Sequence, residues 1–243
     1  MEFIRGFANN NDVNIHYIDN NIKESSNTTL LICPGLSETA EDYINLMSSI
    51  DDRRCVAFSF RGRGCSDIPE NGYDLLDHTK DIQSVVNHLG LDKFCIMGIS
   101  RGVSYELGYA IKHYSSLKGV IIGEYPPVHK QMPKGWAKES MNFYNEYCES
   151  ISITYEVLKS IEDESTQVNF NNNLKDIKCP VLVLKGELEE SLLGSEDIVN
   201  YVNNLGSSSI RIEKFEKVGH DLISEDFYRL VKVINSFLLS IDK

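Results

Sequence analysis

Short apolar runs alternate with longer amphipathic stretches along most of the chain. This alternation is typical of a mostly parallel β-sheet that is covered by helices. The runs that we interpret as strands are Glu2–Phe7, Val13–Ile18, Thr29–Cys33, Cys55–Phe60, Phe94–Ile99, Leu117–Ile122, Val181–Leu184 and Ile210–Phe215. The stretches with helical spacing of apolar residues are Glu38–Ile50, Asp74–Leu89, Gly102–His113, Glu196–Leu205 and Phe227–Leu239.

The connections between these runs predict which strands of the sheet are antiparallel and which are parallel. The first two strands flank the turn-prone triplet Asn9-Asn10-Asn11, which indicates a β-hairpin. Helical crossovers join the other strands, so we expect an α/β fold with eight strands, mostly parallel. The polar, Asn-rich stretch 126–175 breaks the alternation and contains two helix-like pieces, Trp136–Tyr147 and Tyr155–Ile161. We therefore expect a single domain over residues 1–243, with a short helical lid over the carboxyl ends of the strands.

Charge and cysteine usage exclude several classes of partner. The chain has 24 Lys and Arg against 36 Asp and Glu, a net charge of −12, which disfavours binding to nucleic acid or to an anionic membrane. No apolar run is long enough to span a membrane, and the start lacks the apolar core of a signal peptide, so we expect a cytoplasmic protein. The six cysteines form no CxxC pair and do not cluster with histidines at ligand spacing. We expect reduced thiols, no metal and no other cofactor; the oligomeric state is left open.

A candidate nucleophile lies between the fifth strand and the helix after it. The sequence Gly98-Ile99-Ser100-Arg101-Gly102 has the form G-x-S-x-G. A serine on such a tight strand-to-helix turn presents its hydroxyl at the top of the sheet. Its placement between an apolar strand and a helix makes Ser100 a much stronger candidate than the pentapeptide alone would.

A candidate base and a candidate oxyanion hole follow from the same geometry. His220 comes shortly after the last strand, so its imidazole is expected at the same sheet edge as Ser100. Backbone N–H groups supply the oxyanion hole in such sites. We expect one from Arg101 and one from Leu36, in the loop after the third strand, although that loop is also compatible with an ordinary strand-to-helix turn.

Five segments, in this order, resemble the α/β-hydrolase superfamily over nearly the whole chain. They are Pro34-Gly35-Leu36, FRGRGCSD at 60–67, GISRG at 98–102, PVLVLKGE at 180–187 and VGHDL at 218–222. The resemblance implies a Ser-His-acid triad and hydrolysis through an acyl-enzyme. Two positions depart from the usual pattern, since Pro34 stands where such families carry His and Ser59 where they carry Asp. Neither position belongs to the triad.

Two glutamates are candidates for the triad acid. The resemblance usually places an acid after the seventh strand, where this chain has Glu189 within a run of acidic residues. In some relatives, such as certain haloalkane dehalogenases, the acid follows the sixth strand, where this chain has Glu124. A glutamate that ends a buried strand needs a partner, and a protonated imidazole is one, whereas a charge run is usually solvated. We favour Glu124 slightly and keep both.

The expected chemistry is hydrolysis of an ester, thioester or lactone of a small to medium substrate. Candidate substrate-binding residues are Arg61, Tyr125 and Trp136, although an arginine can equally pair with surface acids and aromatic residues can pack the lid. The fold also supports carbon–carbon bond hydrolysis, acyl transfer or lyase chemistry. A hydrolase-like ligand sensor that signals through its lid is the alternative from another class.

Overall fold

One eight-stranded sheet organises the protein. The computed structural model describes residues 2–22, 25–50, 52–148 and 151–242, and the strand order is β1-β2-β4-β3-β5-β6-β9-β10. The pairs β1–β2 and β2–β4 are antiparallel and the others are parallel. The strands are β1 Ile4–Asn10, β2 Val13–Asp19, β3 Leu30–Cys33, β4 Cys55–Phe58, β5 Phe94–Ile99, β6 Leu117–Gly123, β9 Val181–Gly186 and β10 Ile210–Phe215.

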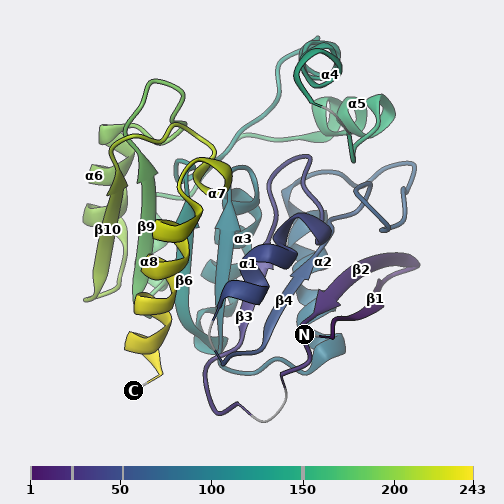
Figure 1. Cartoon of the computed structure of the whole chain (residues 1–243). Helices are drawn as coiled ribbons and strands as arrows, with labels where there is room; N and C mark the ends of the chain where they lie inside the picture. The colour runs from purple at the N-terminus through teal and green to yellow at the C-terminus, as the bar shows by residue number, and fades with distance from the viewer. Residues whose placement is uncertain (1, 23–24, 51, 149–150, 243) are drawn as a thin grey trace.

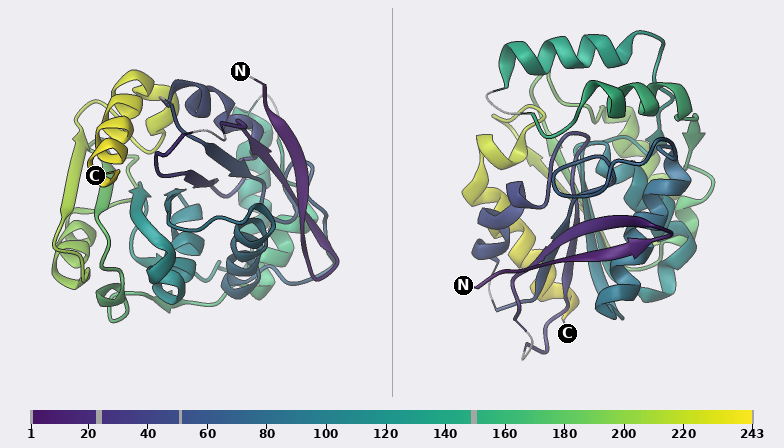
Figure 2. Two further views of the ribbon diagram at one scale, coloured as in Figure 1. Left: turned by 90° about the horizontal axis from the view of Figure 1, so that it is seen from below. Right: turned by 90° about the vertical axis from the view of Figure 1, so that its right-hand side faces the viewer.

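Helices cover both faces of the sheet (Figure 1). On one face lie α1 (Ile44–Ser49) and α8 (Phe227–Ile241), and on the other lie α2 (Leu75–Leu89), α3 (Gly102–His113) and α6 (Ser195–Asn204), as the left view of Figure 2 shows. The short helix α7 (Leu222–Glu225) precedes α8. The α/β architecture expected from the apolar pattern is confirmed, and the predicted strands agree with the observed ones to within a few residues.

Successive residues of the central strands supply the two halves of the core. In β3, Leu31 packs with residues of α2 and α3 such as Val85, whereas Ile32 packs with residues of α1 and α8 such as Met47. All of these side chains are fully buried. Because side chains alternate across a strand, a strand covered by helices on both faces is apolar at every position. This explains why the strands were recognisable as short uninterrupted apolar runs.

The predicted helix Glu38–Ile50 is shorter than expected. A 3-10 turn, η1, spans Glu41–Tyr43, and α1 begins only at Ile44. The segment before it is held by polar contacts, because the Glu38 carboxylate accepts hydrogen bonds from Gly35 N and Tyr43 Oη, and Ala40 N donates to Ser59 Oγ. The bound carboxylate shapes this segment into a loop beside the carboxyl end of the sheet.

The segment between β6 and β9 forms the lid. It contains β7 (Val128–His129), α4 (Trp136–Tyr147), α5 (Tyr155–Glu164), β8 (Val168–Asn169) and the 3-10 turn η3 (Leu174–Asp176), so both predicted lid helices are present. Helices α4 and α5 pack together at the end of the molecule where the parallel strands finish (Figures 1 and 2). They share a small hydrophobic cluster that also contains Tyr73. Within the described residues, no helix is both long and apolar enough to cross a membrane.

A buried ion pair attaches the carboxyl-terminal end of α8 to the sheet. Arg53 Nη2 lies 2.7 Å from Asp242 Oδ2, and Thr28 N donates to Asp242 Oδ1 at 2.8 Å. Burial alone would raise the pKa of the Asp242 carboxyl, but the hydrogen bonds from Arg53 and Thr28 outweigh burial and lower the pKa to about 2.

We expect Asp242→Asn to lower the free energy of unfolding by about 1–2 kcal/mol at pH 7, after allowance for solvent screening. A depressed carboxyl pKa stabilises the fold above the unfolded value near 3.8 and loses this effect as pH falls toward 2. The difference between the two proteins should therefore shrink to about half at pH 3. Urea denaturation at both pH values measures it, and a pH-independent difference would contradict the assigned ion pair.

Candidate active site

Ser100 lies at the junction of β5 and α3 in a left-handed backbone conformation, with φ of +50°. Such a conformation is uncommon for a non-glycine residue and fits the sharp turn predicted from the sequence motif. Two glycines make room for it. A Cβ on Gly98 would lie 2.5 Å from Glu106 Oε2, and one on Gly102 would lie 2.3 Å from the carbonyl oxygen of Pro34. The motif therefore requires glycine at both positions for steric reasons.

His220 faces this serine. It follows β10, and its Nε2 lies 3.0 Å from Ser100 Oγ, a hydrogen-bonding distance. The two residues are 120 positions apart in sequence. The His220 side chain is 34% exposed, so solvent or a substrate can reach the pair. The contact has the geometry in which an imidazole can accept the serine proton.

Glu124 lies on the far side of the imidazole. Its Oε2 is 3.5 Å from His220 Nδ1, and the residue is fully buried. The register of the sheet brings it there: Ile99 of β5 pairs with Gly123 of β6, so Ser100 and Glu124 leave adjacent strands at the same level. Like Ser100, Glu124 has a positive φ, +56°.

Three donors other than His220 surround the Glu124 carboxylate. Gly186 N and Ser191 Oγ donate to Oε1 at 2.6 and 2.9 Å, and Leu192 N donates to Oε2 at 3.0 Å. Hydrogen bonds of this kind stabilise an ionised carboxylate in a buried position. The arrangement can therefore hold a negative charge next to the imidazole.

Glu189 lies elsewhere. It is exposed, in the turn that follows β9. The loop that carries it, 187–193, supplies the hydroxyl of Ser191 and the amide of Leu192 to the Glu124 carboxylate. The structure thus brings together Ser100, His220 and Glu124, and does not bring Glu189 into contact with them.

The two predicted oxyanion donors flank the serine. Gly35 is close to Ser100, since a Cβ built on Gly35 would lie 3.4 Å from Ser100 Cβ. Gly35 N is already bonded to Glu38 Oε2 at 2.5 Å. Within the described part of the chain, the amides of Leu36 and Arg101 have no hydrogen-bond acceptor. They are the N–H groups that a developing oxyanion could use.

Arg63 is a buried residue beside the predicted oxyanion loop that the sequence analysis did not single out. Its buried guanidinium donates from Nε to the carbonyl oxygen of Leu36 at 3.0 Å and from Nη1 to that of Arg61 at 2.6 Å. It thereby fixes the carbonyl of the peptide unit that follows Leu36. The sequence holds no signal for this contact, because the residues around an arginine in a glycine-rich loop do not reveal whether its side chain points inward or outward.

The expectation that Arg61 binds substrate at a pocket mouth is wrong. Arg61 is 6% exposed, and its Nη2 and Nε donate to the fully buried Asp81 at 2.7 to 3.2 Å. A guanidinium that already saturates a buried carboxylate has no free face for a substrate. Arg101 is also turned inward, where its side chain donates to Tyr105 Oη and to the carbonyl of Lys130.

The two aromatic candidates have packing contacts instead of exposed faces. Tyr125 is 4% exposed, and its carbonyl accepts a hydrogen bond from Tyr201 Oη. Trp136 is partly buried in the lid cluster, which also includes Leu36. Trp136 therefore belongs to the contact between the lid and the oxyanion loop.

A second Ser-His-Asp arrangement lies below the first and differs from it in burial. Ser104 Oγ is 3.0 Å from His129 Nδ1, and His129 Nε2 is 3.2 Å from Asp74 Oδ1. Ser104 and His129 are fully buried, and Ser104 Oγ also donates to the carbonyl of Arg101. Burial lowers the pKa of His129 to about 4. This serine has no access to a substrate and links α3 to the base of the lid.

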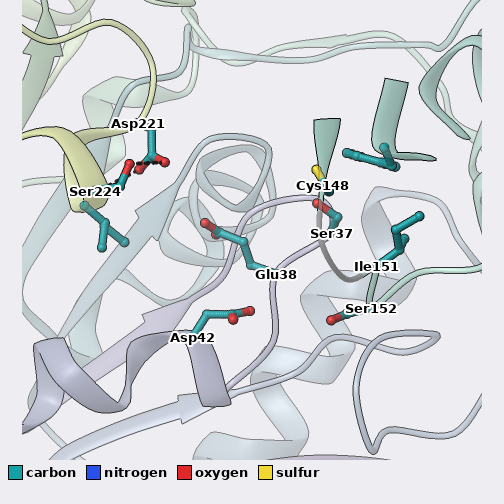
Figure 3. A pocket seen from close by; sticks show the side chains of 10 residues that line it. Ser37, Glu38, Asp42, Cys148, Ile151, Ser152, Asp221 and Ser224 are labelled. Atoms are coloured by element: carbon teal, nitrogen blue, oxygen red, sulfur yellow. Dashed lines mark hydrogen bonds between the residues drawn. The ribbon is translucent and has the colours of Figure 1, made fainter. Parts of the chain in front are cut away.

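A cavity of about 280 Å³ lies between the lid and the segments that follow β3 and β10, and neither Ser100 nor His220 is among the described residues that line it (Figure 3). Ser37, which follows Leu36, and Asp221, which follows His220, both line it. Among the described residues, three carboxylates and no basic side chain line it. The full lining is Ser37, Glu38, Asp42, Tyr144, Cys148, Ile151, Ser152, Asp221, Ile223 and Ser224.

Comparison with known proteins agrees with this geometry. A family model described as the alpha/beta hydrolase fold matches residues 28–136. Haloalkane dehalogenase 2 of Mycobacterium tuberculosis is 32% identical over 111 residues, which cover 45% of this chain and 37% of that protein. A 2-(acetamidomethylene)succinate hydrolase of Mesorhizobium japonicum is 28% identical over 117 residues, 47% of this chain and 42% of that protein. These alignments span less than half of the curated relatives.

Solved structures resemble the whole chain. A carboxylesterase, CesB of Bacillus subtilis, superposes with a TM-score of 0.77 at 16% identity and covers 99% of this chain and 93% of its own. An enol-lactonase of Burkholderia xenovorans gives 0.78 at 14% identity, over 96% of this chain and 100% of its own. At such identities the likeness concerns the fold.

The strand order, the sharp turn at Ser100 and the histidine after the last strand define the α/β-hydrolase fold. The family model covers the segment from β3 through the nucleophile turn to the start of the lid. The chain has the α/β-hydrolase fold.

Proposed function

We propose that this protein is a serine hydrolase that cleaves an ester, thioester or lactone of a small to medium substrate through an acyl-enzyme. The observation that carries the proposal is the 3.0 Å contact between Ser100 Oγ and His220 Nε2, made by a serine whose φ is +50°. A serine hydroxyl is a weak nucleophile at neutral pH and needs such a base to remove its proton.

In the first half of the reaction, Ser100 Oγ attacks the substrate carbonyl carbon while His220 Nε2 accepts the serine proton. The amides of Leu36 and Arg101 donate hydrogen bonds to the oxyanion that forms. His220 then passes the proton to the departing alcohol, thiol or ring oxygen, and the acyl group stays on Ser100.

In the second half, a water molecule attacks the acyl carbon, and His220 takes the proton from that water. Collapse of the second oxyanion releases the carboxylic acid and returns the proton to Ser100 Oγ. The Glu124 carboxylate, 3.5 Å from His220 Nδ1 in the structure, favours the tautomer with the proton on Nδ1 and stabilises the imidazolium that appears in both halves. The three donors on Glu124 support its ionised form.

The relatives' names cover different reactions, and one residue separates them. A haloalkane dehalogenase requires an aspartate nucleophile, and the nucleophile position of this chain is Ser100. The serine favours acyl chemistry, which is the chemistry named for the carboxylesterase and the enol-lactonase of the same fold.

The cavity indicates which substrates to try first. A volume of about 280 Å³ suits a small or medium ligand rather than a long acyl chain. Its carboxylates, Glu38, Asp42 and Asp221, disfavour a substrate with a free carboxylate near the reacting bond. We expect neutral or cationic acyl and leaving groups to be preferred.

Intact mass after treatment with a fluorophosphonate probe tests the nucleophile. We expect one adduct on the wild-type protein, formed with loss of fluoride, and none on Ser100→Ala or His220→Ala. Ser104→Ala is the matched control, because Ser104 also contacts a histidine but is fully buried. Labelling should survive in that variant if it folds, which circular dichroism checks.

The outcomes separate the proposal from its alternatives. Labelling at Ser100 together with turnover of neutral esters, thioesters or lactones supports the hydrolase. Acyl transfer would be favoured by labelling at Ser100 without hydrolysis of these substrates, if new products form with added alcohols or amines. An unlabelled, folded wild-type protein would contradict an activated serine and favour the ligand-sensing alternative.

A further inference from the structure

A second group of side chains of the types that can bind metal ions lies outside the candidate active site. His16 of β2, Glu41 of η1 and Cys65 of the loop after β4 converge, and their nearest ligand atoms all lie within 4.8 Å of one another. His16 Nδ1 is 3.7 Å from Glu41 Oε1. Among the residues that the structure describes, this is the one group of three such side chains at that spacing.

His16 points a buried, unpaired nitrogen into this group. The residue is 3% exposed, and its Nδ1 has no hydrogen-bond partner among the described residues. Burial lowers the pKa of His16, and the Glu41 carboxylate opposes that effect. A neutral imidazole nitrogen with a free lone pair is the form that binds a metal.

The other two side chains are free to complete a site. Neither the Glu41 carboxylate nor the Cys65 thiol takes part in a hydrogen bond among the described residues, and the Glu41 side chain is 40% exposed. Cys65 is also exposed. Of the three, the buried His16 Nδ1 is the unusual one, because buried polar groups are normally satisfied, and the two exposed side chains face it without other hydrogen bonds among the described residues.

The backbone holds the three elements in fixed positions. His16 N donates to Ser66 Oγ, which in turn donates to the carbonyl of Ser59. Asn14 and Asp67 exchange two further hydrogen bonds, from Asn14 N to Asp67 Oδ2 and from Asp67 N to the carbonyl of Asn14. The loop that contains Cys65 is therefore hydrogen-bonded to β2, which places Cys65 beside His16.

We propose that His16 Nδ1, a Glu41 carboxylate oxygen and Cys65 Sγ bind one divalent transition-metal ion of the zinc class. Mixed nitrogen, oxygen and sulfur donors suit Zn²⁺ and Co²⁺, whereas Mg²⁺ and Ca²⁺ require oxygen ligands. On binding, the Cys65 thiol releases its proton to solvent and the thiolate bonds to the metal. Water fills the fourth tetrahedral position.

The spacing is compatible with coordination. Zinc bond lengths place neighbouring ligand atoms of a tetrahedral site about 3.3–3.6 Å apart. The 3.7 Å between His16 and Glu41 is already close to this value. The exposed Cys65 and Glu41 side chains can rotate to close the remaining gap, while buried His16 stays in place.

This site is separate from the triad but touches the same loop. Next to Cys65, Gly64 N donates to the carbonyl of Ser152 in the lid, and Arg63 holds the carbonyl of Leu36. The metal ligands and the Ser100–His220 pair share no residue, so the metal proposal and the proposed hydrolase function can fail independently. The ligands lie 25 and 24 positions apart in sequence, which explains why no motif predicted them.

Cobalt spectroscopy tests the proposal on the full chain. Metal-free protein, prepared with a chelator under reducing conditions, is titrated with Co²⁺. We expect a thiolate-to-cobalt charge-transfer band that saturates at one equivalent, and Zn²⁺ should displace the cobalt. The band should be lost in Cys65→Ser and retained in Cys148→Ser, the matched control with an exposed cysteine elsewhere.

Calorimetry with Zn²⁺ tests the carboxylate. Glu41→Gln changes an exposed side chain and should weaken Zn²⁺ binding at least about tenfold. Absence of the cobalt band in the wild-type protein would overturn the proposal. A band that persists in Cys65→Ser, or equal Zn²⁺ affinities of Glu41→Gln and wild type, would also overturn it.

Discussion

Replacement of Glu124 by glutamine is expected to lower kcat by about 10⁴-fold, the size of effect seen when a triad histidine is left in the wrong tautomer. The amide presents an NH₂ group where the carboxylate presents an oxygen. In the Oε1 position that group would meet the donors of Gly186 and Ser191, and in the Oε2 position it would meet Leu192 N and His220 Nδ1, so either placement sets donors against donors. Steady-state kinetics with the best ester or thioester of the substrate panel measures the loss.

Glu189→Gln is the matched control, since Glu189 lies in the loop that follows β9 and is exposed. Its kcat should stay within about twofold of the wild-type value, because exposed charges far from the reacting atoms contribute little. A large loss in Glu189→Gln together with a small loss in Glu124→Gln would reverse the assignment of the acid. Thermal unfolding of both variants distinguishes loss of catalysis from loss of fold.

Asp81→Ala should destabilise the fold by about 3–5 kcal/mol, the usual result of removing one partner from a buried ion pair. Asp81 is fully buried and accepts from the Nε and Nη2 of Arg61, from Arg61 N and from Asn10 Nδ2. Without the carboxylate, the Arg61 guanidinium is a buried cation whose one remaining acceptor among the described residues is the carbonyl of Gly72. Urea denaturation at pH 7 measures the change in the free energy of unfolding.

The control for this prediction is an ion pair at the surface. Lys159 and Asp163 pair across one turn of α5, and their side chains are 41% and 59% exposed. Asp163→Asn should leave the free energy of unfolding unchanged within experimental error. If Asp81→Ala changed the free energy of unfolding as little as Asp163→Asn, water would have to reach Arg61, and the Arg61–Asp81 pair would not be shielded from solvent.

The sheet was predictable because burial on both faces leaves a strong trace in the sequence. Strands such as β5 and β10 have the bounds expected from their apolar runs. Helix α1 was overestimated because the pattern of apolar residues does not reveal that the Glu38 carboxylate binds Gly35 N and holds the chain as a loop. The spacing of apolar residues cannot reveal where a helix starts when one side-chain hydrogen bond determines the start.

The contact between Ser100 and His220 followed from motif and order, since both residues come after strands that end at one sheet edge. The choice between Glu124 and Glu189 did not, because both follow strands at that edge. Their difference lies in the Ser191 and Leu192 donors that fold back onto Glu124. Arg61 was misread for a similar reason, since its partner Asp81 lies on another element, α2.

The lid can be regarded as a segment that could be replaced as a unit. Val128 of β7 pairs with Asn169 of β8, so the chain leaves the core and returns to it at neighbouring points. The segment between them packs in a small apolar cluster that also contains Tyr73 and Leu36, and its described residues contribute no strand to the main sheet. Recombination or engineering at this junction can alter what the catalyst accepts while β6 and β9 keep their register. Diversification of specificity in this architecture need not disturb the reactive centre.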